Sequence, residues 1–392
     1  MRVQISLVGQ LPYKTVVGGI NFPPPSILVV SCHLVDEHLF LMSTLRGTEL
    51  RTQNRFETTR LESFDDGWDS PELSELPVIQ TEFLPDHSKS ILSKNDSPDL
   101  GFSYSINAYR GCEHGCAYCY ARPSHEYLGM NAGIDFETKI MVKHDAPELL
   151  REAFDRASWK PTLVVMSGNT DCYQPAERKF GITRKVLEVF LEYRNPIGII
   201  TKNALILRDK DILAEMARLN LVQVFLSVTT LDRDLARKLE PRTSTPERRL
   251  LALKSLTEAG VLTGVMIGPV IPGLNDEEIP RILEAASNAG ARSAGYNMVR
   301  LPFAVRPIFE AWLTKNVPLE AGKIMKRIQM VRDGGMNDPN FGSRMRGTGG
   351  YAEYIKELFY KTRKRLGMNQ AETQLTTEHF RRRGELTLFD ER

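Results

Sequence analysis

Three cysteines occupy eight consecutive positions of the sequence, in the segment GCEHGCAYCYAR, at Cys112, Cys116 and Cys119. Thiolates at this C-x3-C-x2-C spacing can each ligate a different iron of a 4Fe-4S cubane, and the fourth iron then has no protein ligand from this segment. A small molecule that carries both an amine and a carboxylate can chelate such an iron. The segment therefore predicts a cluster that binds a ligand at its open iron.

Two other metal sites can be built around the same cysteines. A zinc ion would take the three thiolates together with His114 or His125, although structural zinc sites usually come as paired knuckles separated by a longer loop. An electron-transfer cluster would need a fourth cysteine, Cys172 or Cys32, from another part of the chain. Both alternatives remain open from the residues alone.

The composition limits the class of protein. The chain has 392 residues with 51 Lys and Arg against 49 Asp and Glu, so its net charge does not indicate an anionic partner. Its 5 cysteines do not form a disulfide framework, and a reducing compartment would keep the clustered thiols available as ligands. The apolar stretch 26–42 is interrupted by charged residues and lacks a signal-peptide layout, so we expect a cytoplasmic protein without membrane contact.

Positive charge is concentrated near the C-terminal end. The segment KTRKRLG covers residues 361–367, and three arginines follow at 381–383. Runs of this kind are usually solvated helix faces, but they are also the kind of surface that contacts nucleic acid. Nucleic acid is therefore a candidate partner.

Short apolar runs alternate with helical patterns from Phe102 to Leu301, which is typical of βα units around a parallel sheet. Strands are expected at 103–108, 162–166, 197–201, 222–228, 263–270 and 294–299, and helices at 147–157, 183–193, 210–219, 246–259 and 277–289. Gly260 and Gly290 are expected to end two of the helices in a left-handed conformation. Six units are too few for a closed eight-stranded barrel, so we predict an α/β fold, a partial (β/α)6 TIM-like barrel.

The predicted barrel takes up residues 101–305 only. Residues 1–100, which are polar and acidic from 62 onward, indicate a partly irregular N-terminal extension. Residues 306–392 are expected to form a C-terminal helical extension with a basic tail. Functional groups of such barrels gather at the carboxyl ends of the strands, and the cysteine segment follows the first predicted strand.

The segment SINAYRGCEHGCAYCYARPSHEYLG, followed by GIDFETKIMVK, resembles the radical S-adenosylmethionine (SAM) superfamily. Within that superfamily it is similar to the spore photoproduct lyase-like branch, often labelled DNA repair photolyases, and the resemblance extends from about Arg55 to Lys364. It implies a radical SAM barrel with two cofactors, a 4Fe-4S cluster and SAM, whose methionine end carries the amine and the carboxylate. It also implies reductive cleavage of SAM to a 5′-deoxyadenosyl radical that abstracts hydrogen from a substrate, with an electron donor such as flavodoxin or ferredoxin.

The same resemblance implies roles for individual residues. Cys112, Cys116 and Cys119 match the cluster ligands, and Tyr118 matches an aromatic residue near the adenine. The segments SGNTDCYQP, IITKN, FLSVTTLD and LEPRTSTPERR supply the other matched positions. The candidate cofactor contacts are Tyr118, Gly168, Thr170, Asp171, Lys202, Ser227, Glu240 and Arg249, and Arg242 is a further candidate cavity residue.

Two positions depart from the family pattern. Ala108 replaces the usual proline before the Tyr-Arg-Gly-Cys run. The cysteine that donates a hydrogen atom in spore photoproduct lyase would align near Gly168 and is absent, and Cys172 is out of register with it. The change at Ala108 should affect loop stiffness more than chemistry. The missing cysteine weakens thymine-dimer repair as the activity and leaves the substrate unidentified. The alternative function is a non-catalytic iron-sulfur or zinc protein that binds nucleic acid.

Overall fold

A computed structural model describes residues 46–56, 80–368 and 375–383, all within one compact unit, Thr44–Arg392. Cys32 and most of the predicted N-terminal extension lie outside these residues. None of the described helices is long and apolar enough to cross a membrane.

A seven-stranded sheet with the order β10-β9-β8-β7-β6-β3-β2 forms the centre of this unit. Six of its strands are parallel, and they begin and end within two residues of the predicted positions. They are β3 (Tyr104–Ile106), β6 (Val164–Met166), β7 (Ile197–Thr201), β8 (Val222–Ser227), β9 (Leu262–Val270) and β10 (Ser293–Met298). The edge strand β2 (Leu92–Lys94) is antiparallel to β3. Because β2 does not pair with β10 at the other edge, the sheet is not closed, and the predicted partial α/β barrel is confirmed.

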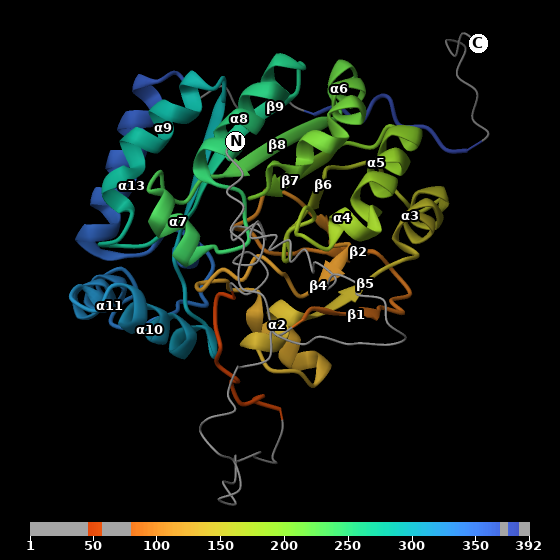
Figure 1. The fold of residues 1–392 in the computed structure, drawn as a ribbon. Coiled ribbons are helices and arrows are strands. Elements are labelled where there is room, and N and C mark those ends of the chain that lie inside the picture. The colour runs from red at the N-terminus through yellow and green to blue at the C-terminus, as the bar shows by residue number, and fades with distance from the viewer. Residues whose placement is uncertain (1–45, 57–79, 369–374, 384–392) are drawn as a thin grey trace, which may run out of the picture. The chain divides into compact units, whose positions relative to one another are not determined.

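Helices connect successive parallel strands and lie outside the sheet (Figure 1). They are α3 (Ala146–Asp155), α5 (Ile182–Tyr193), α6 (Lys210–Arg218), α8 (Pro246–Glu258) and α9 (Ile279–Asn288). Thr245 caps α8 by accepting a hydrogen bond from the Arg248 amide, and Pro246 occupies its first turn. Gly260 and Gly290 have φ angles of 85° and 97°, which confirms the left-handed ends predicted for α8 and α9.

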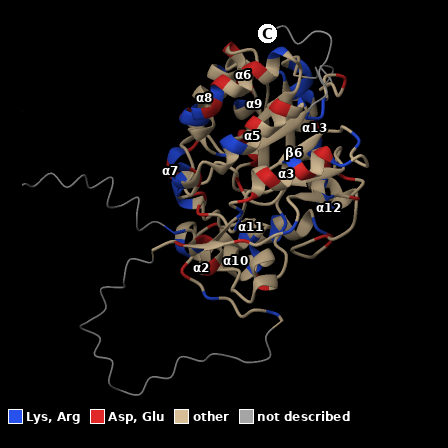
Figure 2. Cartoon of the chain, turned by 90° about the vertical axis from the view of Figure 1, so that its right-hand side faces the viewer, with Lys and Arg blue, Asp and Glu red and all other residues tan. Residues whose placement is uncertain are grey.

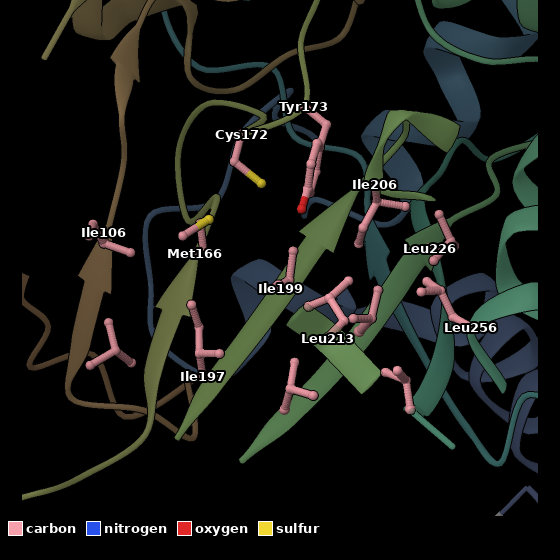
Figure 3. Close-up of a cluster of buried hydrophobic side chains, with 14 of the residues drawn as sticks. Ile106, Met166, Cys172, Tyr173, Ile197, Ile199, Ile206, Leu213, Leu226 and Leu256 are labelled. Atoms are coloured by element: carbon pink, nitrogen blue, oxygen red, sulfur yellow. The ribbon is translucent and has the colours of Figure 1, made fainter. Parts of the chain in front are cut away.

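The hydrophobic core lies between this sheet and the helices that cover it. Strand residues such as Ile197, Ile199 and Leu226 are fully buried against helix residues such as Leu213 and Leu256 (Figure 3). Burying these aliphatic side chains supplies most of the driving force for folding, at about 1.5–3 kcal/mol for each. The same core contains Cys172, which lies beside Met166 and Tyr173 (Figure 3).

A second, three-stranded sheet was not predicted from the sequence. It has the order β1-β5-β4, with β1 (Glu82–Pro85), β5 (Lys139–Val142) and β4 (Tyr109–Arg110). β4 and β5 pair antiparallel, so the two ends of the loop between them lie side by side. This loop contains all three clustered cysteines. This loop also contains the 3₁₀ helix η2 (Arg122–Leu128) and the helix α2 (Ile134–Thr138).

The chain after β10 is helical, with α10 (Val305–Asn316), α11 (Ala321–Met330), α12 (Ser343–Arg346) and α13 (Gly349–Arg365). α13 packs against α9, and α12 packs against β10. Lys361 and Arg365 of α13 pair with Glu357 and Glu284.

The arginines at 381–383 contact the protein's own surface. The Arg381 amide donates to the Tyr193 carbonyl at 3.0 Å, and the Arg383 guanidinium pairs with Glu192 at 2.9 Å. An Arg382 N–H donates to the Trp159 carbonyl at 3.1 Å. Both signs of charge are interspersed on the helices seen in Figure 2. The three arginines at 381–383 therefore bind within the chain.

Candidate functional site

A cavity of about 320 Å³ opens at the carboxyl ends of the parallel strands and extends toward the open edge of the sheet. All three clustered cysteines line it, together with five of the other predicted site residues. Those five are Tyr118, Gly168, Asp171, Lys202 and Ser227. The structure thus brings together residues from the cysteine loop and from the ends of β6, β7 and β8.

The cysteine loop is held by one buried guanidinium, that of Arg122 (0% exposed). Its Nε and Nη2 atoms donate to the Cys116 carbonyl at 3.1 and 3.0 Å, and its Nη1 donates to the Gly133 carbonyl at 2.9 Å. Its Nη2 also pairs with Glu137 Oε1 at 2.6 Å, and the other oxygen of Glu137 accepts from the Gly47 amide at 2.9 Å. Arg122 therefore ties the backbone at Cys116 to α2 and to the N-terminal segment.

The thiols are buried in a way that fits a metal cluster. Cys112 and Cys116 are each 7% exposed, and burial raises the pKa of both thiols and of Cys119. Thiolates at these positions would therefore need a bound cation to be stable. Within the described ranges, no three His, Cys, Asp or Glu side chains are placed to hold a single metal ion. All three thiols line one cavity, so the donor set fits a group that takes three thiolates, such as an iron-sulfur cluster.

Asp171 connects the end of β6 to the end of β7 and to the cysteine loop. Its carboxylate accepts hydrogen bonds from the Thr201 hydroxyl at 2.7 Å and from the Lys202 amide at 2.8 Å. The same carboxylate lies 3.5 Å from Nδ1 of His114. Burial lowers the pKa of His114 to about 4, so this imidazole is neutral at pH 7. Asp171 thus fixes the Lys202 backbone at the cavity wall.

Tyr118 is supported by a buried ion pair behind the cavity. Its hydroxyl donates to Glu240, which also accepts from the Thr229 hydroxyl at 2.6 Å. Arg249 pairs with the other Glu240 oxygen at 2.5 Å and donates to the Ser227 carbonyl at 2.9 Å. One network therefore positions both the ring of Tyr118 and the end of β8.

Four of the predicted positions lie behind the cavity wall instead of on it. Glu240 and Arg249 pair with each other, and the Thr170 hydroxyl donates to the Tyr109 carbonyl at 2.7 Å. Arg242 pairs with Glu113 at 3.2 Å. None of these four residues lines the cavity, and Thr170, Glu240 and Arg249 hydrogen-bond to other parts of the protein, whereas the buried Nη1 atom of Arg242 has no hydrogen-bond partner among the described residues.

The residues of the alternative metal sites separate in the structure. His114 lines the cavity, whereas Nε2 of His125 lies 2.9 Å from the Lys139 carbonyl, outside the cavity lining. Cys172 is 1% exposed within the core and does not line the cavity. The structure therefore gives the three clustered thiols no fourth cysteine on the cavity wall among the described residues.

Several residues that line the cavity were not predicted from the sequence. Tyr120 directly follows the last clustered cysteine, and its hydroxyl donates to the Gly168 carbonyl at 2.6 Å. Ser167 has a φ of 72°, a strained value for a non-glycine residue, at the end of β6. Among the other unpredicted lining residues, Leu100 and Phe102 lie in the β2–β3 loop, Asn297 lies in β10, and Arg300, Arg344 and Met345 lie in the chain after β10.

Comparison with known proteins identifies the family. Residues 106–286 match the model of the radical SAM superfamily. An uncharacterized protein of Mycobacterium tuberculosis (strain H37Rv) is 36% identical over 233 residues, which cover 59% of this chain and 68% of that protein. The chain belongs to the radical SAM superfamily. An uncharacterized protein of Methanocaldococcus jannaschii is 32% identical over 178 residues, covering 45% of this chain and 64% of that protein.

The radical SAM fold is also found among solved structures. Spore photoproduct lyase complexed with a dinucleoside spore photoproduct superposes with a TM-score of 0.53 over 72% of this chain and 79% of that one, at 15% sequence identity. A mutant of the same lyase with bound SAM superposes with the same TM-score. This likeness shows a shared fold, and the substrate of the lyase does not transfer with it.

We expect Arg122→Met to lower the free energy of unfolding by about 3–5 kcal/mol, because the change leaves the buried Glu137 carboxylate without its counter-charge. Urea unfolding at pH 7 measures the loss. The control is Arg306→Met, which removes an exposed ion pair to Glu310 and should cost no more than about 1 kcal/mol. Equal effects of the two changes would contradict the anchoring role of Arg122.

The Glu240–Arg249 pair predicts a pH dependence of stability. Burial alone would raise the pKa of Glu240, but the charges of Arg249 and Lys202 and two hydrogen-bond donors lower it from 4.5 to about 2. Because the folded pKa lies below the unfolded one, the stabilisation is fully present above pH 5 and is lost as the pH falls toward 2. It amounts to about 3 kcal/mol at 1.36 kcal/mol per pKa unit.

The free-energy difference between the wild type and Glu240→Gln should therefore be largest near pH 7 and shrink steadily below pH 4.5 in urea unfolding. Glu310→Gln, at an exposed position, serves as the control and should show no such trend. A difference that stays constant from pH 7 to pH 3 would show that the charge of Glu240 is not the source of its stabilising effect.

Proposed function

We propose that this chain is an enzyme that uses a 4Fe-4S cluster, ligated by Cys112, Cys116 and Cys119, to cleave SAM reductively. When bound, the cluster and SAM supply a 5′-deoxyadenosyl radical that abstracts hydrogen from a substrate. The observation that carries the proposal is the convergence of the three thiols and the Lys202 ammonium on one cavity at the strand ends.

Lys202 is the residue proposed to bind the carboxylate of SAM. Its ammonium lies 6.0 Å from the centre of the Tyr118 ring and forms no ion pair with any described carboxylate. The Lys202 backbone is fixed at both ends, because its amide donates to Asp171 at 2.8 Å and its carbonyl accepts from the Ser244 amide at 3.3 Å. A cation that is placed before the ligand arrives loses little entropy on binding it.

Tyr118 and Ser227 are proposed to contact the remainder of SAM. The Glu240–Arg249 network holds the Tyr118 ring at the cavity wall, which gives an adenine ring an aromatic surface on which to pack. The hydroxyl of Ser227 lies at the end of β8 and supplies a polar group on the same wall. Gly168, at the end of β6, contributes a backbone surface without a side chain.

The apolar residues around these groups are proposed to keep water away from the reactive cofactor. Leu100, Phe102 and Met345 line the outer part of the cavity. Excluding water protects a radical from quenching by solvent. We also propose an electron donor of the flavodoxin or ferredoxin type and a cytoplasmic location, because clustered thiols need a reducing compartment.

The proposal predicts formation of 5′-deoxyadenosine after anaerobic reconstitution with iron and sulfide and reduction in the presence of SAM. Cys116→Ala should form none, because it removes a cluster ligand. Lys202→Met should raise the KM for SAM about tenfold to a hundredfold, which corresponds to loss of a charge-assisted contact of about 1.5–3 kcal/mol. Arg306→Met, far from the cavity lining, is the matched control for removing a positive charge. Wild-type product at the level of Cys116→Ala would refute the proposal.

A separate measurement addresses the four-cysteine alternative. Because Cys172 is buried in the core away from the cavity, Cys172→Ala should retain the iron and sulfide content of the wild type and the response of the cluster's EPR spectrum to added SAM. Loss of both on Cys172→Ala, with the protein still folded by circular dichroism, would favour an ordinary electron-transfer cluster instead.

A further inference from the structure

Arg300 is a second cation on the cavity wall, and the proposed cofactor contacts do not use it. It follows β10 directly, and its guanidinium lies over the Tyr120 ring, with Cζ 4.8 Å from the ring centre. The Tyr120 hydroxyl donates to the Gly168 carbonyl at 2.6 Å. Tyr120 therefore reaches from the end of β6 to Arg300, and supports the guanidinium by a cation–π contact.

The backbone around Arg300 is fixed by the protein before any ligand binds. The buried Arg332 (3% exposed) donates to the Met298 carbonyl at 3.0 Å and to the Val299 carbonyl at 2.7 Å. On the other side, the Leu301 amide donates to the Met336 carbonyl at 3.0 Å. A guanidinium stacked on an aromatic ring and carried by such a backbone presents its N–H edge in a defined direction.

No described carboxylate neutralises Arg300. Asp99 is one acidic group near it, and Arg344 already binds this carboxylate at 2.5 Å. The Gly342 amide also donates to Asp99. Burial lowers the pKa of Arg300, the direction expected for a cation with insufficient counter-charge. The outer half of the cavity therefore holds a positive charge that a bound anion would balance.

The charges on the cavity wall assign that anion to a molecule other than SAM. Among the described residues that line the cavity, the cations are Lys202, Arg300 and Arg344, and Asp99 neutralises the last of these. SAM carries a single carboxylate, for which Lys202 is the proposed partner. Arg300 is then left for a group on the second reactant.

The surroundings of Arg300 indicate what adjoins the anionic group. Leu100, Phe102 and Met345 present apolar surface, and Asn297 supplies an amide. A planar oxyanion can accept two N–H bonds from one guanidinium, and this makes arginine the preferred residue for carboxylate and phosphate groups. An apolar or aromatic group attached to the oxyanion would contact the surrounding side chains.

We propose that Arg300, stacked on Tyr120, binds a carboxylate or phosphate group of the substrate at the outer end of the cavity. The assignment rests on the proposed function, since it takes the inner end to be the SAM site. The proposed substrate is therefore an organic anion, and its charged group binds at Arg300, away from the carbon atom that loses hydrogen.

The test uses three probes of similar shape, titrated calorimetrically into the reconstituted protein with SAM present. Benzoate and phenyl phosphate carry the two oxyanions, and benzamide is the neutral counterpart of benzoate. We expect at least one of the anions to bind the wild type at least tenfold more tightly than benzamide. The tighter of the two anions identifies the group as a carboxylate or a phosphate, and either result supports the subsite.

Variants of the two unpaired cations assign the binding to one residue. Arg300→Met should weaken the anion at least tenfold and leave benzamide unchanged, and Arg300→Lys should fall between the wild type and Arg300→Met. Lys202→Met, measured at a SAM concentration raised until it saturates this variant, and the exposed Arg306→Met should each bind the anion within about twofold of the wild type. Thermal unfolding of each variant verifies that it is folded.

The subsite would be overturned if neither anion binds the wild type or if benzamide binds as tightly as the anions. It would also be overturned if Arg300→Met binds the anion with wild-type affinity, or if Lys202→Met loses anion binding instead. Formation of 5′-deoxyadenosine by the wild type is measured on the same preparation. Cleavage of SAM without anion binding overturns only the subsite, whereas anion binding without cleavage overturns the proposed enzyme and leaves Arg300 as an anion site.

Discussion

The buried guanidinium of Arg122 is the interaction on which the site depends. A loop between β4 and β5 has no sheet of its own to hold it, so its carbonyls need internal donors. Arg122 supplies donors to Cys116 and Gly133 and is neutralised by Glu137 on α2. These contacts fix the loop backbone beside Cys116. The position of the thiols therefore depends on a residue that does not itself line the cavity.

The other walls of the cavity are joined by a partly buried carboxylate and by a buried ion pair. Asp171 fixes the end of β7 through Thr201 and Lys202, and the Glu240–Arg249 pair fixes the end of β8 and the ring of Tyr118. Parallel strands bring their carboxyl ends to one edge but do not set how far apart the side chains lie. Side-chain-to-backbone hydrogen bonds set that spacing here, so the binding groups can be in place before a ligand arrives.

Much of the fold was accessible from the sequence, because β6 to β10 are apolar runs separated by helices with clear caps and stops, such as Thr245 and Gly260. The small sheet was not accessible from the sequence. Its strand β4 has only two residues, and β1 pairs with β5 through Glu82 and Lys139, which are far apart in the chain. Among the site residues, the motifs located Lys202 and Ser227 on the cavity wall, but they could not show that Thr170 and Glu240 are not part of its lining. Arg300 lies in no motif, and only the folded chain brings it beside Tyr120.

The ion pair between Asp99 and Arg344 joins residues from the two ends of the described chain across the open edge of the sheet. During synthesis on a ribosome, the β strands and the cysteine loop are complete well before residue 344 emerges. The wall formed by Arg344 and Met345 is therefore the last part of the cavity lining to be synthesised.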